Sequence, residues 1–467
     1  MNDQPQKQSF ISKSSAPAWK LGIIAVIILV LLIPVAWISS LIHERYTRKD
    51  SVTSEIASKW GSAQIVAGPF ISVPYVVSSK VKDENGNDKV VTHTHYLHVS
   101  PETMNITGNV TSIIQHRGIF KVPGYKAELD ISCSTPVMIE TGSLLESKVL
   151  DWENALVTFD LDDERGLKEL KGSLNGQPLL FKKSDNVMRV SKTPEPVKNT
   201  RGSFSSFSSN PEEKKESSFK FEAKIPQGSS PEGAKIKLHL TMTGTQQLSF
   251  LTSAINETIQ LKSDWLSPSF IGDILPDGRS INEKGFIATW KTNYLNTGNK
   301  PSWTSEEPTI NLSTLGVNFL IMVDAYQQTT RTLKYAILFL LLTFMVFFFA
   351  ETISKQRIHP IQYLMVGCSL ILFYLLLLSI SEHIGFGWSY LVAATGIILQ
   401  ISLYCYSILK TRKFALQVGG MLAGLYAFLY ILLRLEDSAL LVGSISLFVL
   451  LGIAMYIIRN VNWYGQE

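Results

Sequence analysis

Three histidines within residues 92–98 have a spacing that could hold a metal ion. In an extended strand His93 and His95 lie on one face and His98 points to the other, whereas a closed zinc site takes four ligands. No matching carboxylate or cysteine accompanies them in the sequence. Two interpretations follow, weak binding by two imidazoles or a solvated Thr/His face beside a hairpin. We favour the second and expect no metal and no cofactor.

A second group of polar residues occurs where apolar segments are interrupted near the C-terminus. Glu382 and His383 lie in one break, and Arg434, Glu436 and Asp437 lie in another. Charged groups in or near membrane spans are costly unless they are paired or hydrated, which makes them candidates for function. We expect these five residues to meet on the outer side of the membrane, where they would dock a soluble domain or line a small vestibule. The alternative is a set of interfacial loop residues in contact with headgroups and water.

Other polar and small residues of the apolar region have structural interpretations. Glu351 is expected to end its helix and reach the inner interface. Gly420 and Gly424 form a small-residue face that predicts close helix packing inside a bundle, with homodimerisation as the alternative use.

Motifs of the common enzyme classes are absent from the sequence. It contains no Walker A, HExxH, GxSxG, CxxC or dinucleotide-binding glycine pattern. The net charge of +4 and the lack of a basic stripe argue against a nucleic-acid partner. We therefore predict a non-enzymatic protein and name no catalytic residue.

The elements that would position these residues are mainly membrane spans. Five apolar segments in the last third are long enough to cross a bilayer, at about 333–350, 361–380, 388–409, 416–433 and 439–458. Their short breaks predict a five-helix bundle over residues 332–458, followed by a tail at 459–467. A sixth span at 19–40 follows a polar tail at 1–18. It lacks a clear cleavage site, so we interpret it as an uncleaved signal anchor, with a cleaved signal peptide as the alternative.

Residues 41–331 contain no segment long enough to span and have the pattern of strands. Stretches rich in Val, Ile, Tyr and Thr, among them 64–77, 89–99 and 235–251, alternate with turn residues. Asn85-Gly86 between two such stretches predicts a hairpin. The pattern favours a large, sandwich-like, mostly-β domain of one or two lobes, with a loop at 192–217 that lacks periodicity. The predicted fold is therefore an α+β membrane protein with six transmembrane helices.

The distribution of cations predicts the orientation in the membrane, because Lys and Arg favour cytoplasmic loops. The breaks at 354–360 and 410–413 carry cations, whereas 381–387 carries none and 434–438 has one Arg beside two acids. This alternation places both termini in the cytoplasm and the β-rich domain outside. The cations on the outer flank of the first span argue weakly against it; they are Arg45, Arg48 and Lys49.

Short motifs that run in order along nearly the whole chain carry a family resemblance. They are Gly68-Pro69, Val73-Pro74-Tyr75, Arg117-Gly118-Ile119-Phe120, Asp264-Trp265, Val323-Asp324-Ala325-Tyr326-Gln327, His359-Pro360-Ile361-Gln362-Tyr363, Ser381-Glu382-His383 and Leu435-Glu436-Asp437. In these the sequence resembles the inner membrane protein CreD family. The resemblance implies a bacterial inner-membrane location and a role in cell-envelope integrity or envelope stress. It implies no biochemical activity.

Two functions from different classes fit these expectations. A third, a membrane hydrolase or transferase, would need paired acids and bases lining one pocket, and only the outer cluster around Glu382 and His383 could supply them. In the first, the outer β-rich domain of a bilayer-embedded protein binds an envelope component or a partner protein. In the second, the bundle acts as a transporter or flippase for a lipid or cell-wall intermediate. The second needs a polar path through the bundle, and the few ionisable groups in the spans count against it.

Overall fold

The structure is a computed structural model of the 467-residue chain. It describes residues 16–82, 88–138, 148–184, 190–191, 216–217, 221–306, 310–319, 325–354, 358–409, 412–435 and parts of 441–455. The chain divides into two compact units, a helical unit of Met1–Asp50 with Val323–Glu467 and a sheet unit of Ser51–Met322. The mixed α+β class predicted from the sequence is confirmed.

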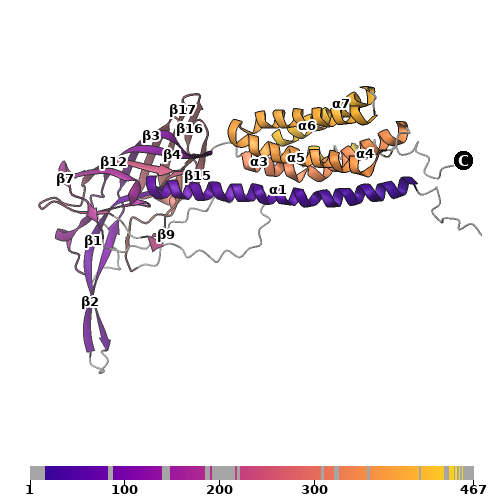
Figure 1. Ribbon diagram of the computed structural model, residues 1–467. Coiled ribbons are helices and arrows are strands. Elements are labelled where there is room, and N and C mark those ends of the chain that lie inside the picture. Colours follow the sequence, from indigo (N-terminus) through magenta and orange to yellow (C-terminus); the bar gives the residue numbers. More distant parts are fainter. Residues whose placement is uncertain are drawn as a thin grey trace, which may run out of the picture. The chain divides into compact units, whose positions relative to one another are not determined.

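The helical unit contains long apolar helices and one short, more polar helix at residues 325–334 (Figure 1). They are α1 (Ala16–Trp60), whose last residues belong to the sheet unit, α3 (Ala325–Lys334), α4 (Ala336–Ser354), α5 (Pro360–Ile384), α6 (Phe386–Leu409) and α7 (Arg412–Arg434). Among the described residues four helices are long and apolar enough to cross a membrane, or five if α3 and α4, bent by 46°, form one span. Of the predicted span at 439–458, part lies outside the described residues.

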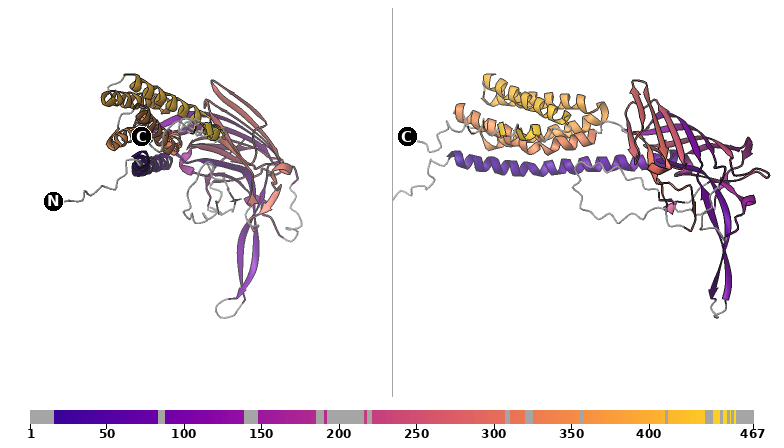
Figure 2. Two further views of the ribbon diagram at one scale, coloured as in Figure 1. Left: turned by 90° about the vertical axis from the view of Figure 1, so that its right-hand side faces the viewer. Right: turned by 180° about the vertical axis from the view of Figure 1, so that it is seen from behind.

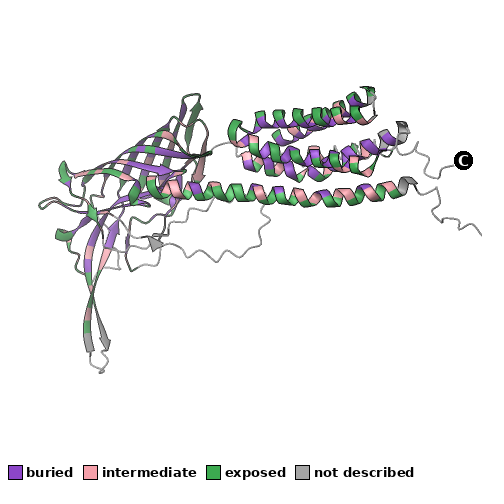
Figure 3. Cartoon of the chain, viewed as in Figure 1, coloured by how far each residue is buried: buried purple, intermediate pink, exposed green. Residues whose placement is uncertain are grey.

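Local signals explain where α5 begins and ends. His359 and Gln362 form a capping box, and Pro360 occupies the first turn, where its missing N–H costs no hydrogen bond. Gly385, with φ of 81°, separates α5 from α6. Exposed residues lie along these helices (Figure 3). Many of them have large apolar side chains, as expected for surfaces that hydrocarbon would cover.

The sheet unit is built from two large sheets. The first runs in the order β15 (Pro268–Gly272), β20 (Thr314–Phe319), β13 (Gln247–Leu251), β1 (Gln64–Lys82), β5 (Leu156–Leu161), β11 (Phe221–Lys224) and β8 (Lys182–Lys183), with β2 (Asp88–Val99) on β1 and β18 (Ser302–Thr304) on β2. The second runs in the order β16 (Gly278–Asn282), β17 (Gly285–Asn293), β14 (Asn256–Ser263), β3 (Thr103–Arg117), β4 (Phe120–Ser134), β12 (Lys235–Thr245), β6 (Leu167–Leu174) and β7 (Gln177–Leu179).

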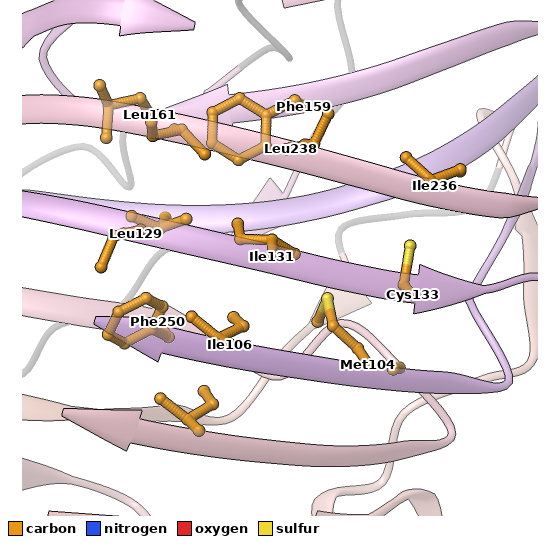
Figure 4. Close-up of a cluster of buried hydrophobic side chains, with 14 of the residues drawn as sticks. Met104, Ile106, Leu129, Ile131, Cys133, Phe159, Leu161, Ile236, Leu238 and Phe250 are labelled. Carbon is orange, nitrogen blue, oxygen red and sulfur yellow. The ribbon is translucent and has the colours of Figure 1, made fainter. Parts of the chain in front are cut away.

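One hydrophobic core joins the two large sheets. Phe159 and Phe250 of the first sheet and Leu129 and Leu238 of the second belong to the same buried cluster (Figure 4). In β3 and β4 buried and exposed residues alternate, so these strands have one face in the core and one in solvent. A small third sheet pairs β9 (Val190–Ser191) with β10 (Glu216–Ser217) and β19 (Ile310–Asn311).

The predicted hairpin at Asn85-Gly86 is confirmed in its strands, since β1 and β2 pair antiparallel from Ile71↔Val99 to Lys82↔Asp88. The turn itself lies outside the described residues. The paired strands extend as a ribbon beyond the rest of the sheet unit (Figure 2). Apart from β10, the predicted loop at 192–217 also lies outside the described residues.

The prediction of one continuous strand over residues 235–251 is wrong, because the structure has two strands there. Gln246 has φ of 63°, which breaks the extended chain and separates β12 from β13. The two halves join different sheets. The pattern of apolar and β-branched residues continues across Gln246, so no signal in the sequence marks the turn there.

Candidate functional site

Glu382, a residue of the predicted outer cluster, connects three helices of the helical unit. It lies in the last turn of α5, and its Oε1 accepts a hydrogen bond from the Tyr326 hydroxyl of α3 at 2.9 Å. The Nε of Arg45 in α1 is 3.9 Å from the same oxygen. The Glu382 side chain is 11% exposed, so these contacts compensate a carboxylate largely removed from water.

The other members of the predicted cluster are placed differently. His383 is exposed. Arg434 donates from Nη2 to the Tyr430 hydroxyl at 2.9 Å, and its guanidinium lies 5.4 Å from the centre of that ring. Both contacts join Arg434 to a residue of its own helix, α7. Glu436 and Asp437 lie outside the described residues, so the proposed meeting of all five residues stays a prediction.

Sequence reasoning missed the two partners of Glu382. Arg45 was weighed only as evidence on orientation, and Tyr326 only as part of a family motif. The contact with Glu382 gives Arg45 a structural role, while its weight as evidence on orientation is unchanged.

A second carboxylate in the helical unit has a matching set of partners. Glu351 of α4 is buried and accepts hydrogen bonds from the Ile358 N–H and the Tyr363 hydroxyl, each at 3.1 Å. Lys20 of α1 forms an ion pair with it. The expectation that Glu351 merely reaches the interface is therefore incomplete, because it ties α1, α4 and α5 together.

Each of the two carboxylates thus pairs with a tyrosine of another helix and a cation of α1. Lys20 and Arg45 are separated along the α1 axis by about 37 Å at the rise of an α-helix. The hydrocarbon core of a bilayer is about 30 Å thick. The spacing therefore fits one ion pair near each membrane surface, where charges are tolerated.

The structure does not show what Gly420 and Gly424 pack against. A Cβ added at either residue would meet no atom within 4 Å among the described residues. Close approach occurs one residue earlier, where a Cβ at Gly419 would lie 2.5 Å from the Ser402 Oγ of α6. Close packing at Gly420 and Gly424 stays a prediction.

The three histidines of β2 do not form one group. His93 is exposed, and the ring of His95 stacks on Tyr75 with its Nε2 3.7 Å from Glu306. His98 is buried, with Nδ1 2.8 Å from the Ser72 Oγ, and burial lowers its pKa to about 3. His98 is therefore neutral at physiological pH. Within the described ranges no cluster of three His, Cys, Asp or Glu residues has a geometry that could hold a metal.

A polar groove on the solvent face of the second sheet was not anticipated from the sequence. It has a volume of about 470 Å³ and crosses β3, β4, β12 and β6. Two cross-strand rows of side chains meet there, as the strand register dictates. The first row is Lys171, His239, Asp130 and Thr107, and the second is Ser173, Lys237, Ser132 and Asn105.

The groove combines one close histidine–carboxylate contact with two lysine side chains. His239 Nδ1 lies 2.7 Å from the Asp130 carboxylate directly across the strand pair. Lys171 is paired with Glu169 beside it. Lys237 is exposed, and no salt bridge to it is found among the described residues. The groove can thus present an ammonium group together with neutral donors and acceptors.

Comparison with known proteins places the chain in a family. The family model described as "Inner membrane protein CreD" matches residues 16–464. The chain belongs to the CreD family. Inner membrane protein CreD of Escherichia coli (strain K12) is 30% identical over 461 residues, which cover 96% of this chain and 94% of the relative. The resemblance drawn from the sequence motifs is confirmed.

Solved structures add little to this assignment. An M1 zinc metallopeptidase from Deinococcus radiodurans shares 10% identity, covering 48% of this chain and 42% of its own, with a TM-score of 0.23. A score this low carries no argument about fold or activity. The CreD assignment therefore rests on sequence, and the candidate spans are consistent with a membrane protein.

Proposed function

We propose that this CreD family member is a non-enzymatic, multi-pass protein of the bacterial inner membrane whose sheet unit lies in the periplasm and binds an envelope component. Both termini lie in the cytoplasm. The observation that carries the proposal is the polar groove on the second sheet, built from four adjacent, hydrogen-bonded strands. Binding there would contribute to envelope integrity or to the response to envelope stress.

The chemistry of the groove favours an anionic, hydroxyl-rich component. Lys237 supplies a positive charge, and Lys171 a second one shared with Glu169. Asn105, Ser132 and other neutral side chains in the groove supply hydrogen-bond donors and acceptors. No Phe, Tyr or Trp side chain is among the described residues that line the groove, so recognition by stacking on these rings is not expected. A carboxylate- or phosphate-bearing envelope polymer matches this set.

Charge reversal in the groove tests the proposal. The double variant Lys171→Glu and Lys237→Glu should reduce binding of the purified full-length protein to isolated cell-envelope material at least tenfold. The matched control is Lys262→Glu with Lys291→Glu, on strands β14 and β17 of the same sheet but outside the groove. Both variants change the net charge equally, so a groove-specific loss cannot be ascribed to total charge.

The same variants should differ in cells that lack the native protein. The control pair should restore resistance to detergent, and the groove pair should fail at equal protein level. Separate binding assays with peptidoglycan and with lipopolysaccharide identify the source of the anionic group. Equal binding by the groove variant and the wild type in every assay would refute the proposal.

A further inference from the structure

Three tyrosines from three helices meet inside the helical unit. Tyr374 of α5, Tyr390 of α6 and Tyr426 of α7 are all buried. The ring of Phe373 lies 4.7 Å from that of Tyr426 and 5.4 Å from that of Tyr390. The Tyr390 and Tyr426 rings are 6.4 Å apart, and the Tyr374 ring lies 5.1 Å from that of Phe373. Three polar groups therefore converge in an apolar environment.

Among the described residues, only one of these hydroxyls has a hydrogen-bond partner. Tyr390 donates to the backbone carbonyl of Tyr426 at 2.7 Å. The hydroxyls of Tyr374 and Tyr426 are buried and have no hydrogen-bond partner among the described residues. A hydroxyl without a partner is costly in hydrocarbon, where no water compensates for it. Two such donors in one cluster of aromatic rings point to a bound ligand that carries acceptor atoms.

A row of two tyrosines and one arginine on α7 leads from the buried tyrosine cluster to the end of that helix. Tyr426, Tyr430 and Arg434 recur every four residues and so share one face of the helix. The Tyr430 ring lies 5.3 Å from that of Tyr390. The Tyr430 hydroxyl accepts a hydrogen bond from the exposed Arg434. The row extends over about 12 Å of helix from Arg434 to Tyr426. It leads from a cation at the helix end to the buried hydroxyls.

We infer that the helical unit binds one anionic phospholipid along this row. The headgroup phosphate would pair with the Arg434 guanidinium, which suits phosphate through its paired N–H donors. Acceptor oxygens below the phosphate would receive hydrogen bonds from Tyr426 and Tyr374. The inference does not depend on the groove of the sheet unit, because it uses other residues and another class of ligand.

The test uses the purified full-length protein in detergent and phosphatidylglycerol, with phosphatidylcholine as the neutral lipid. Phosphatidylglycerol should raise the unfolding temperature of the wild type, and native mass spectrometry should retain one lipid. The double variant Tyr374→Phe and Tyr426→Phe should bind it at least tenfold more weakly. Arg434→Gln should lose the preference for the anionic lipid. Tyr406→Phe, on the exposed face of α6, is the matched control and should behave as wild type.

The direction of the change in basal stability gives a second, independent readout. If the hydroxyls bond a lipid that co-purifies, removing them should lower the unfolding temperature. If they have no partner, removing them should leave it unchanged or raise it, and the lipid shift should persist. That second pattern, or a wild type that does not distinguish the two lipids, would overturn the inference.

Discussion

The Tyr326 hydroxyl donates to the Glu382 carboxylate across 2.9 Å and so fixes α3 to the end of α5. Tyr326 is buried, and the Glu382 side chain is 11% exposed. A hydrogen bond to a charged group in such a place contributes more than an ordinary one, because the lost partner leaves a desolvated charge. The contact therefore holds the bent α3–α4 segment against α5.

Tyr326→Phe should destabilise the helical unit by about 1.5–3 kcal/mol, the range for a hydrogen bond to a charged group. The measurement is thermal or denaturant unfolding of the full-length protein in detergent. His383→Ala changes the exposed neighbour of Glu382 and is the control, with an expected effect within about 0.5 kcal/mol. Equal stability of Tyr326→Phe and the wild type would show that the hydrogen bond does not hold the helices.

The Lys20–Glu351 pair predicts an asymmetric response to mutation. Lys20→Ala leaves Glu351 with the Tyr363 hydroxyl and the Ile358 N–H, but without a cation. The Glu351 side chain is 9% exposed and that of Lys20 is 33% exposed, so removing only the cation leaves a largely buried carboxylate without its counter-ion, which is more harmful than removing both charges. Lys20→Ala should therefore be less stable than the double variant Lys20→Ala with Glu351→Gln.

Unfolding in detergent measures this difference, and Arg48→Ala, an exposed cation of the same helix, is the control. If the losses of stability caused by Lys20→Ala and by Glu351→Gln simply add in the double variant, the carboxylate is adequately solvated without Lys20. The assigned role of the pair would then be wrong.

Glu257 makes the stability of the sheet unit depend on pH. It is buried on β14, its Oε2 accepts from the Ser253 N–H, and burial raises the pKa from 4.5 to about 8. Between these values the folded chain retains a proton that the unfolded chain releases. The stabilising contribution is thus complete below pH 4.5 and is lost as pH rises towards 8, by up to about 1.4 kcal/mol per pH unit.

Glu257→Gln should remove this slope and be more stable than the wild type at pH 9. Differential scanning calorimetry of the full-length protein from pH 5 to 9 measures how stability depends on pH. Glu283→Gln, at an exposed position, is the control. Parallel pH profiles for Glu257→Gln and the wild type would mean that the carboxyl group is not desolvated as described.

Two glycines in the helical unit should respond to alanine in opposite directions. Gly385 has φ of 81°, so alanine there should cost about 1 kcal/mol or more from backbone strain. Gly396 lies inside α6 with open space at the added Cβ, so alanine there should stabilise by about 0.5–1 kcal/mol. Unfolding in detergent measures both, and a stabilised Gly385→Ala would refute the assigned turn between α5 and α6.

Much of the helical unit could be predicted because hydropathy and length are local properties of the sequence. The breaks at Gly385 and before Pro360 are also local signals. The partners of Glu351 and Glu382 could not be predicted, because Lys20 and Arg45 lie hundreds of residues away along the chain. Only packing brings them together.

The sheet unit was less accessible to sequence reasoning. β3 and β14 pair in parallel and were not predicted, although both alternate buried and exposed residues. The groove depends on register, since a shift by one residue would turn Asp130 and His239 into the core. Register is a relation between strands, and no single stretch of sequence contains it.

The central claim is that the sheet unit and its groove face the periplasm, and labelling of single cysteines tests it most directly. Lys237→Cys and Lys413→Cys are introduced separately after replacing Cys133, Cys368 and Cys405 with alanine. A membrane-impermeant maleimide is then applied to the outside of spheroplasts. The account predicts labelling at position 237 and none at 413 until the membrane is lysed. Labelling at 413 with protection at 237 would contradict it.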